Sequence, residues 1–110
     1  MKILLDECVD RRFARELPGH SVETVYSMNW AGIQNGELLR QGERTAFDVF
    51  IIVDRNLAFQ QNVGEMKLSV VVLCAHSNRL VNLSPLAADV LRQLPQLKRG
   101  EVRRVSETKT

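Results

Sequence analysis

Residues 2–7 read KILLDE and decide the fold, because an apolar run leads directly into two acids. Residues 49–54, which read VFIIVD, repeat the arrangement further along the chain. Short continuous apolar runs are typical of strands that are buried on both faces of a parallel sheet. Ligands collect at the carboxyl ends of such strands. We therefore expect Asp6 and Asp54 on one edge of the sheet, where two carboxylates are costly to hold together unless a cation joins them.

The composition is that of one ordinary globular domain. The chain has 110 residues, of which 45% are hydrophobic and 25% are charged, which suits one core and is too short for two domains. The net charge of +2 permits a nucleic-acid partner without requiring one. The first apolar run ends at Asp6, no run approaches the length of a membrane span, and Cys8 and Cys74 lack the spacing of a metal or redox motif. These features predict a reduced, cytoplasmic protein with no membrane partner.

The rest of the chain alternates between strand and helix patterns. Asp10 is placed to cap the first helix, and Ser84 followed by Pro85 is placed to open the last. Alternation at this length predicts an α/β fold: a mostly parallel five-stranded sheet with helices on both faces, joined by right-handed crossovers. The domain then covers residues 1–105, and residues 106–110 form a polar tail. The expected strands are 2–5, 21–28, 49–53, 67–75 and 101–105, and the expected helices are 10–17, 35–46, a short one from 56, and 85–94.

Four acids follow expected strands or open the second helix: Asp6, Glu7, Glu37 and Asp54. Because side chains alternate along an extended segment, only one of the first two faces the cluster easily, and we favour Asp6. Hard cations such as Mg²⁺ take oxygen ligands, so these carboxylates fit a metal site that ionises a water and polarises a scissile phosphate. Structural alternatives exist, because a helix dipole favours an acid at the helix start and a turn favours an aspartate after a strand. Spacing alone leaves both explanations open.

Asp48 provides a comparison with Asp54, since it precedes the strand that Asp54 follows. At about 3.3 Å per residue the two lie roughly 20 Å apart, on opposite edges of the sheet. We therefore expect a structural role for Asp48 and exclude it from the site. His20 falls toward the same edge as Asp48, and we assign it no role.

The order of several short motifs resembles that of the PIN-like domain family, and more narrowly of its short bacterial branch. The motifs are KILLDEC at residues 2–8, WAG at 30–32, NGELL at 35–39 and FDVFIIVDRNL at 47–57. The resemblance extends from residue 2 to about residue 83. It implies a parallel-sheet nuclease fold that cleaves RNA with Mg²⁺ or Mn²⁺. Because this branch includes candidate toxins of toxin–antitoxin pairs, it also implies an antitoxin protein as a partner.

By position, the resemblance implies that Asp6, Glu37 and Asp54 bind the metal and are catalytic. Two positions depart from the family pattern: Ile52 stands where a hydroxyl residue is common, and Asn56 stands where a further acid is common. Asn56 can still ligate a metal through its carbonyl oxygen but brings no charge. A catalytically silent member of the family, which binds a partner protein instead, is therefore the alternative.

Arginines that follow the expected strands are candidates for contact with substrate phosphates, which guanidinium groups bind by bidentate hydrogen bonds. We expect this role for Arg11 and Arg55, with Asn78 orienting a water or a phosphate; solvated surface is the alternative for each. Trp30 has the chemistry to stack on a base, but we expect it to pack under its own loop. We expect His76 to be a neutral loop residue rather than a proton carrier.

A phospho-acceptor receiver domain is the strongest function of another class. It resembles this chain in starting with a strand that ends in an acidic pair, and in having a later strand that ends in aspartate. Receivers need a lysine just after a late strand, however, and residues 73–76 read LCAH. The Met-Pro segment that usually follows the acceptor aspartate is also missing. The sequence thus favours a nuclease over a silent module or a receiver, and an exposed helix face would allow a homo-oligomer in each case.

Overall fold

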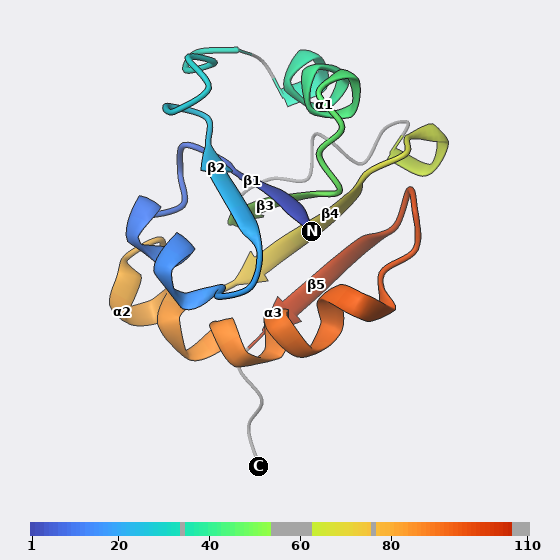
Figure 1. The fold of residues 1–110 in the computed structure, drawn as a ribbon. Coiled ribbons are helices and arrows are strands. Elements are labelled where there is room, and N and C mark those ends of the chain that lie inside the picture. The colour runs from blue at the N-terminus through green and yellow to red at the C-terminus, as the bar shows by residue number, and fades with distance from the viewer. Residues whose placement is uncertain (34, 54–62, 76, 107–110) are drawn as a thin grey trace.

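The computed structural model describes residues 1–33, 35–53, 63–75 and 77–106. Five parallel strands form one sheet in the order β2-β1-β3-β4-β5. Helices cover both faces of the sheet (Figure 1), which confirms the expected α/β class. The strands are β1 (Lys2–Leu5), β2 (Ser21–Thr24), β3 (Val49–Val53), β4 (Ser69–Cys74) and β5 (Val102–Ser106).

The two apolar runs at residues 2–5 and 49–53 form strands β1 and β3 in the middle of the sheet. Every residue of β3 is buried, because β1 pairs with it on one side and β4 on the other. The register places Leu5 beside Ile51, and Ile51 beside Val71, so these three side chains share one face. Their neighbours along each strand point to the opposite face. Two separate apolar cores result, one on each side of the sheet.

The first face is covered by segments from both ends of the chain. A 3-10 helix, η1 (Arg11–Glu16), lies over β1 and β2 and buries Phe13 completely. A continuous helical run covers the rest of that face and consists of α2 (Leu80–Leu83), η3 (Ser84–Leu86), α3 (Ala87–Gln93) and η4 (Leu94–Gln96). The second face is covered by α1 (Asn35–Arg44), which buries Leu38 and Leu39, and by η2 (Val63–Glu65). None of the helices in the described part of the chain is long and apolar enough to span a membrane.

Several element boundaries differ from those predicted, and three of the differences matter for the site. The first helix has 3-10 geometry over six residues, although Asp10 does cap it by accepting the backbone N–H of Arg12 at 2.9 Å. The second strand ends at Thr24 rather than at residue 28, because a hydrogen-bonded turn follows it. The last helical run starts at Leu80, four residues before the expected cap. Ser84 therefore lies inside the run, and its hydroxyl donates to the carboxylate of Glu16 instead of capping a helix.

The last crossover differs in hand from the first. The β1–β2 connection through η1 and the β4–β5 connection through α2 and α3 pack on the same face, but they step along the sheet in opposite directions. The two connections therefore have opposite hands, and the prediction that all crossovers are right-handed is wrong. The physical reason is burial of apolar surface. Because η1 has only six residues and leaves part of the first face uncovered, the last helical run packs on that face, where Leu83, Leu86 and Val90 complete the core.

Candidate functional site

Asp6 lies at the boundary between β1 and β3, at the carboxyl end of the sheet. Its backbone N–H donates to the carbonyl of Ile51 at 2.9 Å, which continues the β1–β3 pairing by one residue. The chain passes from β1 to β2 on one side and later adds β3 on the other, so this boundary is the point where the strand order reverses. Parallel sheets bind ligands at such switch points, outside the carboxyl ends of the strands.

The carboxylate of Asp6 is partly buried and accepts a hydrogen bond from the Sγ of Cys8 at 2.8 Å. It lines a surface hollow of about 780 Å³, which we call the Asp6 hollow. The hollow lies where β1 and β2 end and η1 begins. Its lining comprises Asp6, Glu7, Val9, Asp10, Arg11, Thr24, Tyr26 and Ser27.

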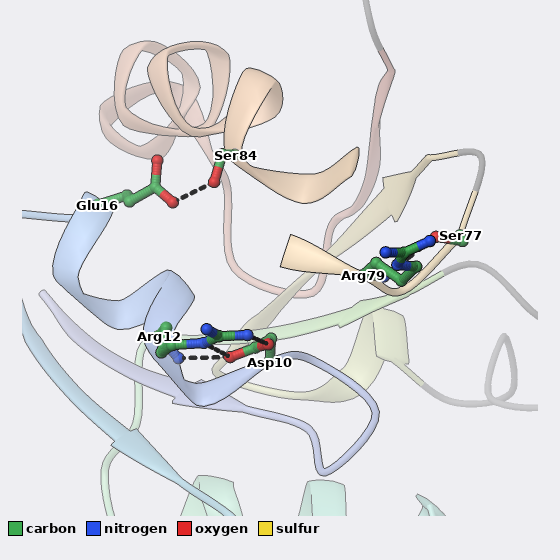
Figure 2. A network of polar contacts seen from close by, with 6 residues as sticks. All are labelled: Asp10, Arg12, Glu16, Ser77, Arg79 and Ser84. Carbon is green, nitrogen blue, oxygen red and sulfur yellow. Dashed lines mark hydrogen bonds and ion pairs between the residues drawn. The ribbon is translucent and has the colours of Figure 1, made fainter. Parts of the chain in front are cut away.

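Arg11 is the arginine with charge available in this hollow. It is exposed, and its side chain makes no hydrogen bond or ion pair among the described residues. Arg12, in contrast, makes a bidentate ion pair with Asp10, in which Nη2 lies 2.7 Å from Oδ2 and Nε lies 3.0 Å from Oδ1 (Figure 2). The side-chain hydrogen bond from Arg12, with the backbone N–H of that residue, lowers the pKa of Asp10 from its ordinary 3.8 to about 2. The predicted site residues Asp6 and Arg11 therefore line the same hollow, and Arg12 neutralises the charge of Asp10.

A second hollow of about 810 Å³, the Arg79 hollow, adjoins the first across Asp10. It is lined by Asp10, Arg12, Arg79, Leu80, Val81, Ser84 and Pro85. Figure 2 shows Arg79 beside Ser77 and apart from the Asp10–Arg12 pair, on the segment that enters α2. The backbone N–H of Arg79 donates to the Oγ of Ser77 at 3.1 Å, and its guanidinium has no partner among the described residues. A second available cation therefore lies on the same edge of the sheet as Arg11.

Glu37 occupies the first turn of α1, as expected, but its carboxylate is engaged elsewhere. Oε1 lies 3.2 Å from Nη2 of Arg40, and Oε2 lies 3.5 Å from Nη1 of Arg44. Glu37 lines neither hollow. These contacts agree with the structural alternative for Glu37 in this state of the protein, and its expected role as a metal ligand stays a prediction.

Three of the expected site residues, Asp54, Arg55 and Asn56, lie outside the described residues, as do His76 and the expected helix from residue 56. Within the described part of the chain, no three His, Cys, Asp or Glu side chains converge on a point that could hold a metal ion. Since Asp54 is not part of that search, the metal site remains a prediction. Ile52, one of the two departures from the family pattern, is 4% exposed and packs in the core of the second face.

The structure also shows the positions of Asn78, Trp30 and Asp48. Asn78 is exposed and lines neither hollow. Trp30 packs edge-on against Phe47, with ring centroids 6.0 Å apart, in agreement with the expected packing role. Asp48 lies at the amino end of β3 and accepts the backbone N–H of Lys2 at 2.8 Å, which is the structural role expected of it.

Tyr26 is the residue of this site that the sequence did not reveal. An alternating pattern over residues 21–28 suggested a strand in which Tyr26 shares a face with Val22. The structure instead buries Val25 completely and leaves Tyr26 64% exposed in the lining of the Asp6 hollow. The signal that could have located it is the spacing of Thr24 and Ser27, since hydroxyl residues three apart often cap a turn.

No model of a known protein family matches this chain, and no curated protein or solved structure matches it. The resemblance stated above therefore has no independent support, and function has to be argued from the site alone.

Proposed function

We propose that this protein is a divalent-metal-dependent ribonuclease of the PIN-like type, using Mg²⁺ or Mn²⁺. One observation carries the proposal: the partly buried carboxylate of Asp6 lies at the switch point of a parallel sheet, in a hollow that also holds Arg11. The combination offers an oxygen ligand for a hard cation and a guanidinium for a phosphate side by side.

The surroundings of Asp6 fit a metal ligand. Its carboxylate accepts a hydrogen bond from a thiol, which is a weak donor, and Glu7 lines the same hollow. Without a cation, these two carboxylates would repel a phosphodiester. Arg12 already neutralises Asp10, so Arg11 is the remaining cation among the described residues that line the hollow. An anionic substrate therefore gains from a divalent cation at this position.

In the proposed reaction, Asp6 and Asp54 would hold the cation, with Glu37 completing the set if it exchanges its arginine partners for the metal. When bound, the cation lowers the pKa of a water and polarises the phosphodiester. Arg11 orients the substrate by contact with a non-bridging phosphate oxygen. The antitoxin partner implied by the resemblance would act by covering this edge of the sheet.

A silent binding module is the first alternative. The ion pairs of Glu37 with Arg40 and Arg44 and the burial of Ile52 favour it, because they give structural roles to two positions of the family pattern. Such a module keeps the fold but binds no divalent cation at Asp6.

A receiver-like domain is the second alternative, and the strand order favours it, because flavodoxin-like and receiver sheets share the order 2-1-3-4-5. In a doubly wound sheet with uniformly right-handed crossovers, the β4–β5 connection would lie on the same face as α1. Here it packs on the first face with η1. This difference, and the absence of lysine from residues 73–77, weigh against a receiver.

The test is cleavage of a mixed single-stranded RNA pool in Mn²⁺, Mg²⁺ or chelator. We expect cleavage with either metal and none with chelator. Asp6→Asn and Asp54→Asn should each lower the rate by more than about a hundredfold, because each removes a charged ligand. Asp48→Asn, which alters an acid on the opposite edge of the sheet, is the matched control and should cleave at the wild-type rate.

The outcomes separate the three functions. Cleavage that Asp6→Asn and Asp48→Asn lower equally would show that the assignment of the site to this edge is wrong. Absence of cleavage, together with no Mg²⁺- or Mn²⁺-dependent rise in melting temperature, would establish the silent module. Stoichiometric modification of Asp54 by acetyl phosphate, in place of cleavage, would establish the receiver.

A further inference from the structure

The turn that follows β2 presents Tyr26 in a fixed position. Thr24 and Ser27 cap the turn reciprocally: the backbone N–H of Thr24 donates to the Oγ of Ser27, and the backbone N–H of Ser27 donates to the Oγ1 of Thr24, both at 2.9 Å. Val25, between them, is fully buried, and its backbone N–H donates to the carbonyl of Leu5 at 3.0 Å. The turn is thus anchored to β1, and it leaves the tyrosine side chain outside.

The exposure of Tyr26 has no structural explanation in the described part of the chain. There, Tyr26 is the one aromatic residue in the exposed class, at 64%, whereas Phe13, Phe47 and Phe50 are buried and Trp30 packs on Phe47. Because hydrogen bonds already hold the backbone of the turn, the backbone needs no further ordering when the ring stacks on a ligand. Such a ring is the platform on which proteins hold unpaired bases.

The neighbours of Tyr26 define the chemistry of its ligand. The Asp6 hollow joins the ring of Tyr26 to the guanidinium of Arg11 and to the carboxylates of Asp6 and Glu7. Its volume of about 780 Å³ lies in the range of small-molecule sites. A flat aromatic face, a guanidinium with no hydrogen bond or ion pair among the described residues, and the carboxylate that we propose as a metal ligand match, in that order, the base, the phosphate and the scissile linkage of a nucleotide.

We infer that the Asp6 hollow is a nucleotide subsite for single-stranded RNA, in which one unpaired base stacks on Tyr26 and a phosphate pairs with Arg11. This inference rests on the proposed function and assigns the part of the substrate that lies next to the cleaved bond. A base in a duplex is stacked within its own helix and offers no free face to Tyr26, so the subsite selects unpaired RNA. In this subsite Tyr26 contacts a base of the substrate, and Arg11 contacts a phosphate of the same strand.

The experiment measures binding separately from cleavage. A short fluorescein-labelled single-stranded RNA is titrated with the protein in Ca²⁺, which takes the same oxygen ligands as Mg²⁺, and fluorescence anisotropy gives the Kd. Gel analysis of the same samples checks that the RNA stays intact. Single-stranded DNA of the same sequence and a blunt RNA duplex are compared with it.

We expect Tyr26→Ala to weaken binding of the single strand by about tenfold to a hundredfold, the range for loss of one base–aromatic stack. Tyr26→Phe keeps the ring and should stay within about threefold of wild type. Val102→Ser changes an exposed apolar residue on β5, 39% exposed, and should leave the Kd unchanged. The duplex should bind more weakly than the single strand and should be insensitive to Tyr26→Ala.

Arg11→Gln tests the phosphate contact through its salt dependence. Loss of one phosphate contact lowers the slope of log Kd against log salt by about 0.7 for a single strand. Arg15→Gln changes another exposed arginine of η1, outside the hollow, and should leave the slope unchanged. Equal slopes for the two variants would overturn the role of Arg11.

The inference and the proposed function fail in different ways. Metal-dependent cleavage with a KM that Tyr26→Ala leaves unchanged, and an unchanged Kd, would overturn the subsite and leave the nuclease intact. Binding that depends on Tyr26 without any cleavage would overturn the nuclease and keep the subsite. No binding of single-stranded RNA by the wild type, or equal binding of the duplex, would overturn the inference whatever the cleavage assay gives.

Discussion

The amino and carboxyl edges of the sheet use their charged residues in different ways. At the amino edge, three acids each accept a backbone N–H from a residue that starts a strand or precedes one by up to four positions. The acceptors are Asp48, Glu43 and Glu101, and the donors are Lys2 at 2.8 Å, Lys67 at 2.8 Å and Lys98 at 3.0 Å. The acids of this edge hold the connections to the sheet, and their charge is used within the fold.

At the carboxyl edge, Asp10 is engaged with Arg12 in a similar way, but the neighbouring charged groups are engaged less. Among the described residues, Asp6 accepts a hydrogen bond only from a thiol, and the side chains of Arg11 and Arg79 make no hydrogen bond or ion pair. Tyr26 is exposed beside them. Each of these groups loses stabilisation that an internal partner would give, and each stays available to a ligand. This difference supports the proposal that the carboxyl edge, where charged groups are less engaged within the fold, is the functional one.

Glycine substitutions should distinguish the two edges most strongly. Gly100 precedes β5 at the amino edge with φ of +79°, and an added Cβ would lie 2.7 Å from the carbonyl oxygen of Gly64. Gly100→Ala therefore combines backbone strain with a clash against backbone, and we expect the free energy of unfolding to fall by about 2–4 kcal/mol in urea denaturation.

Gly32 is the matched position, in the loop that follows β2 at the carboxyl edge. Its φ is +88°, but an added Cβ would meet nothing within 4 Å. Gly32→Ala should therefore cost only the strain of the left-handed backbone, about 1 kcal/mol. Equal losses for the two variants would mean that the close packing of the amino edge around Gly100 adds nothing to stability.

The acids should behave in opposite ways when their charge is removed. Asp48→Ala deletes the acceptor for the backbone N–H of Lys2, and at this exposed position we expect a loss of about 1 kcal/mol in the free energy of unfolding. Asp6→Asn keeps an oxygen that can accept the thiol of Cys8 and relieves repulsion from Glu7, so stability should be unchanged or higher. Thermal melts in chelator measure both. A destabilised Asp6→Asn variant would assign Asp6 a structural role instead.

The sequence predicted the sheet well because its signals are local. The runs that end at Leu5 and Val53 are short, apolar and followed by polar residues, and both strands end where expected. The same local signals identified Asp10 as a cap. The placement of Asp6 and Arg11 on one edge then follows from parallel topology alone.

The errors concern features that depend on distant contacts. Ser84 and Pro85 look like the start of a helix, but the apolar residues just before them are needed to complete the core under η1, so the run starts at Leu80. Likewise, Tyr26 fits a strand pattern, and only the hydrogen bond from Val25 to Leu5 and the Thr24–Ser27 caps turn it outward. The core contacts of the last helical run and the hydrogen bond from Val25 to Leu5 join distant parts of the chain and are not visible in a window of local sequence, whereas the Thr24–Ser27 spacing is.

The smallest predicted effect is a dependence of protein stability on pH, and it comes from Asp10 at the carboxyl edge. Asp10 lines both hollows of that edge. Hydrogen bonds from Arg12 lower its pKa in the folded protein to about 2 from an ordinary value of 3.8. Between these two pKa values the unfolded chain binds more protons than the folded one, so this contribution to stability is complete above about pH 4 and is lost as the pH falls toward 2. Asp10→Asn should therefore flatten the rise of melting temperature with pH in that window, and Arg12→Gln should do the same by removing the donor. Arg15→Gln should keep the wild-type slope, and a slope that Arg12→Gln leaves unchanged would show that the pair does not hold in solution.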